Sequence, residues 1–449
     1  MRSRMGIPVC LVVATIFISC AISNAQQTAQ QSAPQISSLE RDRALQMLNT
    51  IAGDVKKHYY DPKFHGLDWD ARVQEAKQRI QTSPTQNAAL SHIAGALDAL
   101  NDSHTFFLPP SRPYVHDYGL QFEIIGEHCF VTRVRPGSDA ETKGIKSGDE
   151  VLSISGIEPN RQNMWQINYV FHTLRPVLTL RLDLRSPDGA PRHVEAAAKF
   201  RELARLKDLT SSGAGGIWDL FREAENSRHL QRARWAESGD LMVLKLPVFN
   251  FSESEVDQII GTARKHSLLI IDLREDPGGR IETLKFLVEG IFGNDVKIPN
   301  RVSRKDTKPL FEKYHPHNSF GGKVVVLLDS QSASCSELFA RLVQLEKRGS
   351  IIGDHSSGSV MESLQYGYAA GMGITVFYGA SITEADVIMS DGKSLEHVGV
   401  APDELVLPTG ADMASGRDPV LAHAAETMGV KITPEDAGKM FPYEWPKEQ

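Results

Sequence analysis

The residues from Lys323 to Gly358 read KVVVLLDSQSASCSELFARLVQLEKRGSIIGDHSSG, and this stretch decides the fold of the C-terminal half. It begins with a continuous apolar run, Val324 to Leu328, which predicts a strand buried on both faces. After a turn of small residues, the spacing of Leu338, Leu342 and Leu345 predicts an amphipathic helix. The short apolar segment from Ser350 to Gly353 predicts the next strand. The stretch is therefore expected to form a strand–helix–strand unit.

Three serines, Ser332, Ser334 and Ser336, lie where the predicted strand leads into the helix. The first turn of a helix has unpaired N–H groups and the positive end of the helix dipole, so a developing oxyanion can be stabilised there. Serine is also a favoured helix N-cap residue. The residues of this stretch alone leave both interpretations open.

The order strand, S-A-S-C-S-E, helix resembles the nucleophile segment of the C-terminal processing (tail-specific) peptidases and the tricorn-core peptidases. In that family the middle serine is the nucleophile, so the resemblance implies this role for Ser334. Three other segments are similar to family motifs in the same chain order: LNDSHT (100–105), LREDPGG (273–279) and EHVGVAPD (396–403). Four ordered matches over about 300 residues are far more specific than any single motif.

The identity of the base that activates Ser334 is suggested by the absence of a lysine. The processing peptidases carry a lysine on the turn after the nucleophile, and Ser359 stands at that place. The tricorn-type members use a serine–histidine pair and a glutamate, which correspond to Ser103, His104 and Glu396. A histidine has a pKa close to the working pH of a general base. The resemblance therefore implies that His104 is the base.

Two points about the base stay open. Either Ser103 or Glu396 could orient the His104 imidazole, as the third member of a catalytic triad does. His355, just before the place of the absent lysine, and Lys393 are the alternative bases.

The oxyanion hole is expected at Gly278 and Gly279, together with the backbone of Cys335. The glycines follow a predicted strand, and without a Cβ their backbone N–H groups can approach a ligand closely. Asp276 stands where the family has asparagine, which puts the geometry of this turn in question. A tight turn with positive φ would explain the same two glycines.

Residues 111–201 are expected to form a PDZ-like, β-rich domain. The sequence YGLQF (118–122) resembles the carboxylate-binding loop of PDZ domains, which implies peptide binding through Gly119, Leu120, Gln121 and Phe122. Such a loop captures a free C-terminal carboxylate while the peptide adds a strand to the sheet. The other interpretation is a β-domain that serves as a spacer.

The N-terminus has the pattern of a secretory signal. Arg2 and Arg4 precede an apolar run from Ile7 to Ile22, and small residues follow at 23–25. The run is shorter than a comfortable membrane span. We therefore expect no membrane span and a periplasmic or secreted mature chain, with lipid anchoring through Cys20 as the alternative.

The fold class is predicted to be multidomain α+β, with a helical N-terminal region and an α/β core. From Met242 onward, apolar strand-like runs alternate with helical patterns, which favours an α/β core, and the resemblance implies a crotonase-like one. In chain order the sequence predicts a signal peptide (1–25), a polar linker (26–38), a helical N-terminal region (39–110), the PDZ-like domain (111–201), a second linker (202–238), the serine peptidase core (239–410) and a C-terminal helical tail (411–449).

Composition excludes several other classes of protein. The net charge is −7 and no basic block is present, which argues against a nucleic-acid partner. Cys129 and Cys335, the two cysteines beyond the signal segment, are expected to be free. No His, Cys or Asp cluster has the spacing of metal ligands, so no metal or other cofactor is expected.

The sequence thus predicts an exported serine endopeptidase whose partners are protein or peptide substrates, bound in part through free C-termini. Two alternatives are a catalytically weakened peptide-binding protein and a non-peptide hydrolase built on the same core, because a fold does not fix its substrate. The oligomeric state is not predicted.

Overall fold

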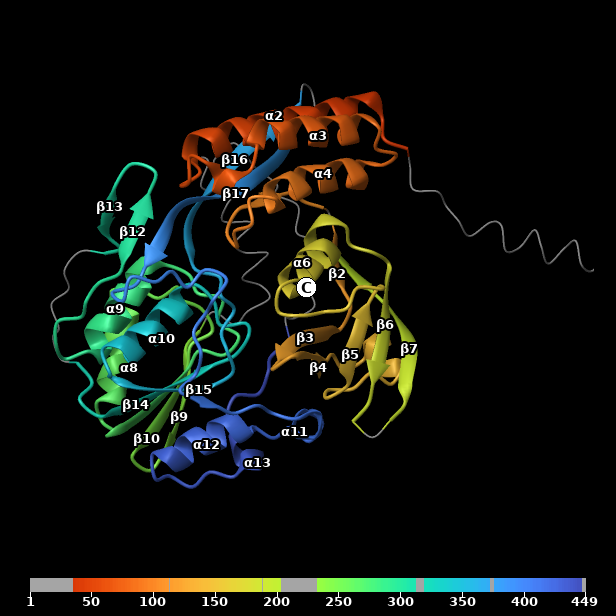
Figure 1. Ribbon diagram of the computed structural model, residues 1–449. Helices are drawn as coiled ribbons and strands as arrows, with labels where there is room; N and C mark the ends of the chain where they lie inside the picture. Colours follow the sequence, from red (N-terminus) through yellow and green to blue (C-terminus); the bar gives the residue numbers. More distant parts are fainter. Residues whose placement is uncertain are drawn as a thin grey trace, which may run out of the picture.

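The computed structural model describes residues 35–112, 114–187, 189–202, 232–311, 319–371 and 375–445. The predicted signal peptide, most of the first linker and residues 203–231 of the second linker lie outside this part. Figure 1 shows three regions: helices at the top, a β-rich domain at the right, and an α/β core at the lower left. Within the described residues, no helix is both long enough and apolar enough to cross a bilayer.

The N-terminal region contains three helices, α2 (Ser38–His58), α3 (Trp69–Gln81) and α4 (Gln86–Asp98), with the short turn η1 (Phe64–Gly66). Each of the three helices has an N-cap side chain, from Ser37, Asp68 and Thr85, that accepts a bond from the first turn. Their apolar faces form one buried cluster that includes Ala380 and Ile382 of the core. The helices are thereby fixed to the core.

The β-rich region, here called the middle domain, has a five-stranded antiparallel sheet in the order β3-β4-β5-β6-β7. Alternating buried residues along its strands form a separate apolar cluster. A ribbon of two further strands, β2 (Tyr114–Asp117) and β8 (Lys199–Glu202), lies at its chain ends. The elements of the domain are β3 (Leu120–Ile125), β4 (His128–Val134), α5 (Asp139–Thr142), β5 (Glu150–Ile154), α6 (Met164–Tyr169), η2 (Val170–Leu174), β6 (Thr179–Arg185) and β7 (Pro191–Ala197).

The core has a six-stranded sheet in the order β18-β15-β14-β11-β10-β9, parallel except for β9. Helices α8, α9 and α10 pack on one face, and α12 packs on the other. The predicted strand–helix–strand unit and the alternation of strands and helices are confirmed. The elements of this layer are β9 (Arg234–Ser238), β10 (Leu241–Lys245), α8 (Glu253–Ala263), β11 (Leu268–Asp272), α9 (Ile281–Ile291), β14 (Lys323–Leu328), α10 (Cys335–Leu345), β15 (Gly349–Gly353) and β18 (Glu404–Leu405).

A second sheet joins the N-terminal region to the core. Its long hairpin of β16 (Met361–Ala370) and β17 (Val376–Ile388) reaches from the core to α2 (Figure 1). Strand β1 (Phe106–Leu108) pairs with β17 in antiparallel register, Phe107 opposite Ala380. The segment just before β1 is thus held beside the core. The other elements are β12 (Asn300–Ser303), β13 (Thr307–Pro309), α11 (Gly410–Ala414), α12 (Pro419–Thr427) and α13 (Pro434–Ala437).

Candidate active site

Ser334 is the residue at which strand β14 and its turn lead into helix α10. Its backbone has φ 54° and ψ −116°, a left-handed φ that is uncommon for residues other than glycine. Such strain at a half-exposed side chain is common at functional sites. The neighbouring serines are fully buried and bonded to backbone carbonyls: Ser332 Oγ donates to Leu273 O at 2.9 Å and Ser336 Oγ to Asp276 O at 3.1 Å. Of the three, Ser334 alone presents its hydroxyl at the surface of the turn.

The glycine turn lies against Ser334. A Cβ on Gly278 would lie 2.7 Å from Ser334 Cβ and 2.8 Å from Cys335 N, and its φ of 89° also favours glycine. Gly278 N–H donates to Asp276 Oδ1 at 2.8 Å. Among the described residues, the N–H groups of Gly279 and Cys335 have no protein acceptor. These two groups, and not Gly278, are therefore available to an oxyanion.

Asp276 lies under this turn and is completely buried. One carboxyl oxygen accepts the Gly278 N–H, and the other, Oδ2, has no partner in the structure. Burial raises the pKa of Asp276 well above its usual value, although the bond from Gly278 acts in the opposite direction. The raised pKa favours the neutral form of the carboxyl group, which is close in shape and charge to the asparagine of the resembling family.

Asp276→Asn is therefore expected to raise the melting temperature of the protein. When the pKa of a group is raised by folding, its contribution to the free energy of unfolding is complete below the unfolded pKa, which is about 3.9 for Asp. This contribution is lost as pH rises through the folded pKa. The gain from asparagine should accordingly grow from pH 5 to pH 8, in a thermal unfolding series. Asp257→Asn on the exposed face of α8 is the matched control. A gain in melting temperature that did not change with pH would contradict the raised pKa of Asp276.

His104 is held in a loop that Asp102 fixes to the core. Asp102 Oδ1 accepts bonds from His104 N at 3.0 Å, from Thr105 N at 2.7 Å and from Thr383 Oγ1 on β17 at 2.6 Å. The imidazole is half-buried, and this burial lowers its pKa below the usual value while the Asp102 charge partly opposes the shift. The lowered pKa favours the neutral form of the ring, which is the form that a general base needs.

Ser103 connects this imidazole to Glu396. Its Oγ lies 2.7 Å from His104 Nδ1 and donates to Glu396 Oε2 at 2.9 Å, and its N–H donates to Oε1 at 2.7 Å. Because the serine proton is directed at the carboxylate, Ser103 Oγ accepts from His104, which places the ring proton on Nδ1. Nε2 is then left with a free lone pair. Ser103 contacts the ring directly, and Glu396 acts on it through Ser103.

Ser334 and Glu396 are bonded to two adjacent residues at the end of the loop 356–360. Ser334 N–H donates to Ser359 O at 2.9 Å, and Val360 N–H donates to Glu396 Oε2 at 2.8 Å. No hydrogen bond joins the Ser334 hydroxyl to His104 among the described residues. Catalytic bonds are often long before substrate binds, so the absence of this bond does not exclude the pair.

Sequence reasoning did not single out Glu337, which lies completely buried in the first turn of α10. Its carboxylate accepts from Ser334 N, Ser359 N, Gly358 N and Ser356 Oγ. Burial raises its pKa to about 7, while these bonds oppose the shift. The capping-box spacing of Ser334 and Glu337 is the sequence signal that would have found it.

The alternative bases lie elsewhere. His355 and Lys393 are exposed, and the His355 ring lies 3.8 Å from Asp354. Neither is hydrogen-bonded to Ser334 among the described residues.

The predicted peptide-binding residues lie at the start of β3, an edge strand whose one partner among the described strands is β4. Gly119 has φ 70° and its N–H donates to Asp117 Oδ1 at 2.9 Å, while Leu120 and Phe122 are buried. The Gln121 amide donates to the Tyr443 hydroxyl of the C-terminal tail at 2.6 Å. Further along this strand, Ile124 O accepts from Ser330 Oγ at 2.5 Å. The edge strand therefore lies beside the nucleophile turn.

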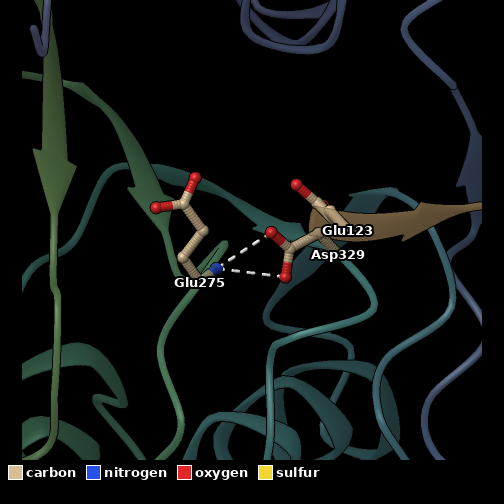
Figure 2. A group of neighbouring side chains, drawn as sticks. All are labelled: Glu123, Glu275 and Asp329. Carbon is tan, nitrogen blue, oxygen red and sulfur yellow. Dashed lines mark hydrogen bonds between the residues drawn. The ribbon is translucent and has the colours of Figure 1, made fainter. Parts of the chain in front are cut away.

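Three carboxylates meet where the middle domain contacts this turn: Glu123 of β3, Glu275 of the glycine segment and Asp329 (Figure 2). One oxygen atom from each of the three lies within 4.8 Å of the others, and Asp329 accepts the Glu275 N–H through both oxygens, at 3.0 and 2.9 Å. Arg133 pairs with Glu275 and helps to lower the pKa of that carboxyl to about 2, against the effect of burial. Burial raises the pKa of Glu123 and of Asp329.

Carboxylate oxygens are ligands that Ca²⁺ uses, but Arg133 already offsets part of the negative charge at this point. The three residues come from separate segments, so ligand spacing in the sequence could not reveal the group.

A strained serine at a helix N-terminus, free N–H groups beside it and a Glu–Ser–His chain define a serine-type hydrolase. Residues 240–406 match the sequence profile "Peptidase family S41". The chain is 20% identical over 366 residues to carboxyl-terminal-processing peptidase 3 of Arabidopsis thaliana, which covers 78% of this chain and 66% of that protein. It is 22% identical to putative tricorn protease homolog 2 of Streptomyces coelicolor, over 82% of this chain and 31% of that protein.

The fold agrees with these matches. The structure of mature CPAF superimposes with a TM-score of 0.63 at 17% identity, covering 84% of this chain and 95% of CPAF. Over residues 240–406 the chain belongs to peptidase family S41, a family of serine-type peptidases, and it is similar to C-terminal processing, tail-specific and tricorn-like proteases.

Proposed function

We propose that this protein is an exported serine endopeptidase that forms an acyl-enzyme on Ser334, with His104 as the general base. The observation that carries the mechanism is the Glu396–Ser103–His104 chain, which holds the imidazole proton on Nδ1 and leaves Nε2 free. The Arg2–Arg4 pair and the following apolar run support export.

The proposed reaction follows from these positions. Nε2 of His104 takes the Ser334 proton as Oγ attacks the carbonyl carbon of the scissile bond. The resulting oxyanion accepts hydrogen bonds from the N–H groups of Gly279 and Cys335, and the dipole of α10 adds to this stabilisation. The imidazolium then gives its proton to the leaving amine. A water molecule, deprotonated by His104, releases the acyl group and restores the serine.

A protein substrate tests this function against its alternatives. The purified protein is incubated with an unfolded protein, and new termini are mapped by mass spectrometry. New internal termini support an endopeptidase. A weakened peptide-binding protein would bind the substrate and produce none, and a non-peptide hydrolase would cleave ester substrates while leaving the protein intact.

The middle domain is proposed to be PDZ-like and to bind free C-termini through residues 119–122. Its five-stranded sheet, with β3 as an edge strand, supports strand addition by a peptide. Substrate bound at this edge would be led toward Ser330 and the nucleophile turn.

The inactive Ser334→Ala protein should therefore bind a peptide acid about tenfold more tightly than the same peptide amide, a difference of about 1.4 kcal/mol. Only the acid offers a carboxylate to the N–H groups of the loop. Fluorescence anisotropy with labelled peptides measures both affinities. Equal affinities would leave the domain as a spacer.

A further inference from the structure

Glu337 is a buried carboxylate that the proposed chemistry does not use, although it contacts the nucleophile backbone. Its two oxygens have different partners. Oε2 accepts from Ser334 N and Ser359 N, both at 3.0 Å, and Oε1 accepts from Gly358 N at 2.7 Å and Ser356 Oγ at 2.5 Å. One carboxylate thus joins the first turn of α10 to the loop 356–360.

The same loop continues directly to the base. The next N–H along the chain, that of Val360, donates to Glu396, which holds Ser103 and through it His104. His397 N also donates to Gly358 O at 2.8 Å. The loop is therefore held between two carboxylates, Glu337 on the nucleophile side and Glu396 on the base side.

We propose that Glu337 is a positioning residue, which sets the distance and direction of Ser334 relative to His104 through residues 358–360. This inference rests on the proposed function. An oxygen shared by the N–H groups of Ser334 and Ser359 fixes these two backbones to each other, and it supports the strained φ of Ser334. A misplacement of about 1 Å at such a site can cost 10²-fold in rate.

A capping role alone would not have this consequence, and the chain offers a control for it. Glu255 is the third residue of α8 and completes a capping box with Ser252 at an exposed helix end. It has the same local role as Glu337 but no bond to a catalytic segment. Loss of either side chain should therefore remove a helix cap, but only loss of Glu337 should lower the rate of catalysis.

The test compares Glu337→Gln, Glu337→Ala and Glu255→Gln with the wild type. We expect Glu337→Gln to lower kcat by about tenfold and Glu337→Ala by on the order of 10²-fold, with KM changed by less than about threefold. The glutamine amide keeps one oxygen that can accept from half of the N–H groups, whereas its NH₂ group cannot accept from the other half. The loss of kcat should therefore be smaller than in Glu337→Ala. Glu255→Gln should match the wild type. Wild-type kcat in folded Glu337→Gln would overturn the proposal.

A second measurement does not depend on activity. Hydrogen–deuterium exchange should become faster at the amides of Ser334, Gly358 and Ser359 in Glu337→Gln, even if the protein hydrolyses nothing. An inactive wild type would reject the proposed function, whereas unchanged exchange at these three amides would reject the role of Glu337. Because glutamine preserves size, this variant remains informative if the alanine variant does not fold.

Discussion

Ser334→Ala is expected to lower kcat on an unfolded protein substrate by on the order of 10⁶-fold. In the proposed mechanism this hydroxyl forms the acyl-enzyme, and the other serines of the turn are not placed to replace it. Ser332 and Ser336 are buried, and both donate to backbone carbonyls. The melting temperature should change by only a few degrees, because the structural role of the Ser334 hydroxyl is to complete the capping box with Glu337 at the start of α10. Steady-state kinetics and thermal unfolding measure the two quantities.

Ser357→Ala is the matched control for this change. Ser357 lies in the adjoining loop, where its hydroxyl contacts Ser359 Oγ at 2.8 Å. Its removal should leave kcat within a few-fold of the wild type. Full turnover in folded Ser334→Ala would show that the nucleophile lies at another residue.

His104→Ala should lose about 10⁵-fold or more in kcat, the second largest effect. In the proposed mechanism its Nε2 accepts the Ser334 proton. Among the described residues no imidazole or amine is hydrogen-bonded to the Ser334 hydroxyl, so the assignment rests on the Glu396–Ser103–His104 chain. Ser103→Ala and Glu396→Gln should lose less, because Ser103 and Glu396 orient the ring and do not themselves take the proton. His355→Ala and Lys393→Ala should both behave like the wild type, since these side chains are exposed and lie outside the chain of bonds.

The pH profile gives an independent check on His104. The neutral ring is the active form, so kcat/KM rises as pH increases through the pKa of His104. Burial lowers that pKa, so the midpoint of the rise should lie below the unperturbed value of about 6.5. A lysine base would move the midpoint upward. Near-wild-type turnover in His104→Ala, with collapse in His355→Ala or Lys393→Ala, would contradict the tricorn-type arrangement.

The core could be predicted because its signals are local. The run from Val324 to Leu328 is apolar at every position, and only a strand with both faces covered satisfies it, as β14 is. The helix after it shows its period in Leu338 and Leu342. Bringing Ser103 beside Glu396, 293 residues away, needed the family resemblance, since nothing local indicates that β1 pairs with β17.

What the sequence could not predict depends on contacts between separate segments. The resemblance indicated that a glycine turn binds the oxyanion. It could not show that the Gly278 N–H already donates to Asp276. The cluster of Glu123, Glu275 and Asp329 forms only when the middle domain meets the core. Glu337 is the last residue of the S-A-S-C-S-E motif, but the sequence could not show its bonds to residues 356–359, which exist only after the loop folds onto α10.

The measurement that tests the central claim most directly is labelling with a fluorophosphonate probe, followed by peptide mapping of the adduct. The probe reacts with a serine only when a base activates it and an oxyanion site receives the phosphonyl oxygen. We predict a single adduct on Ser334 in the wild type and none in His104→Ala. An adduct on another serine, such as Ser359, or no adduct on folded wild-type protein, would contradict the assignment.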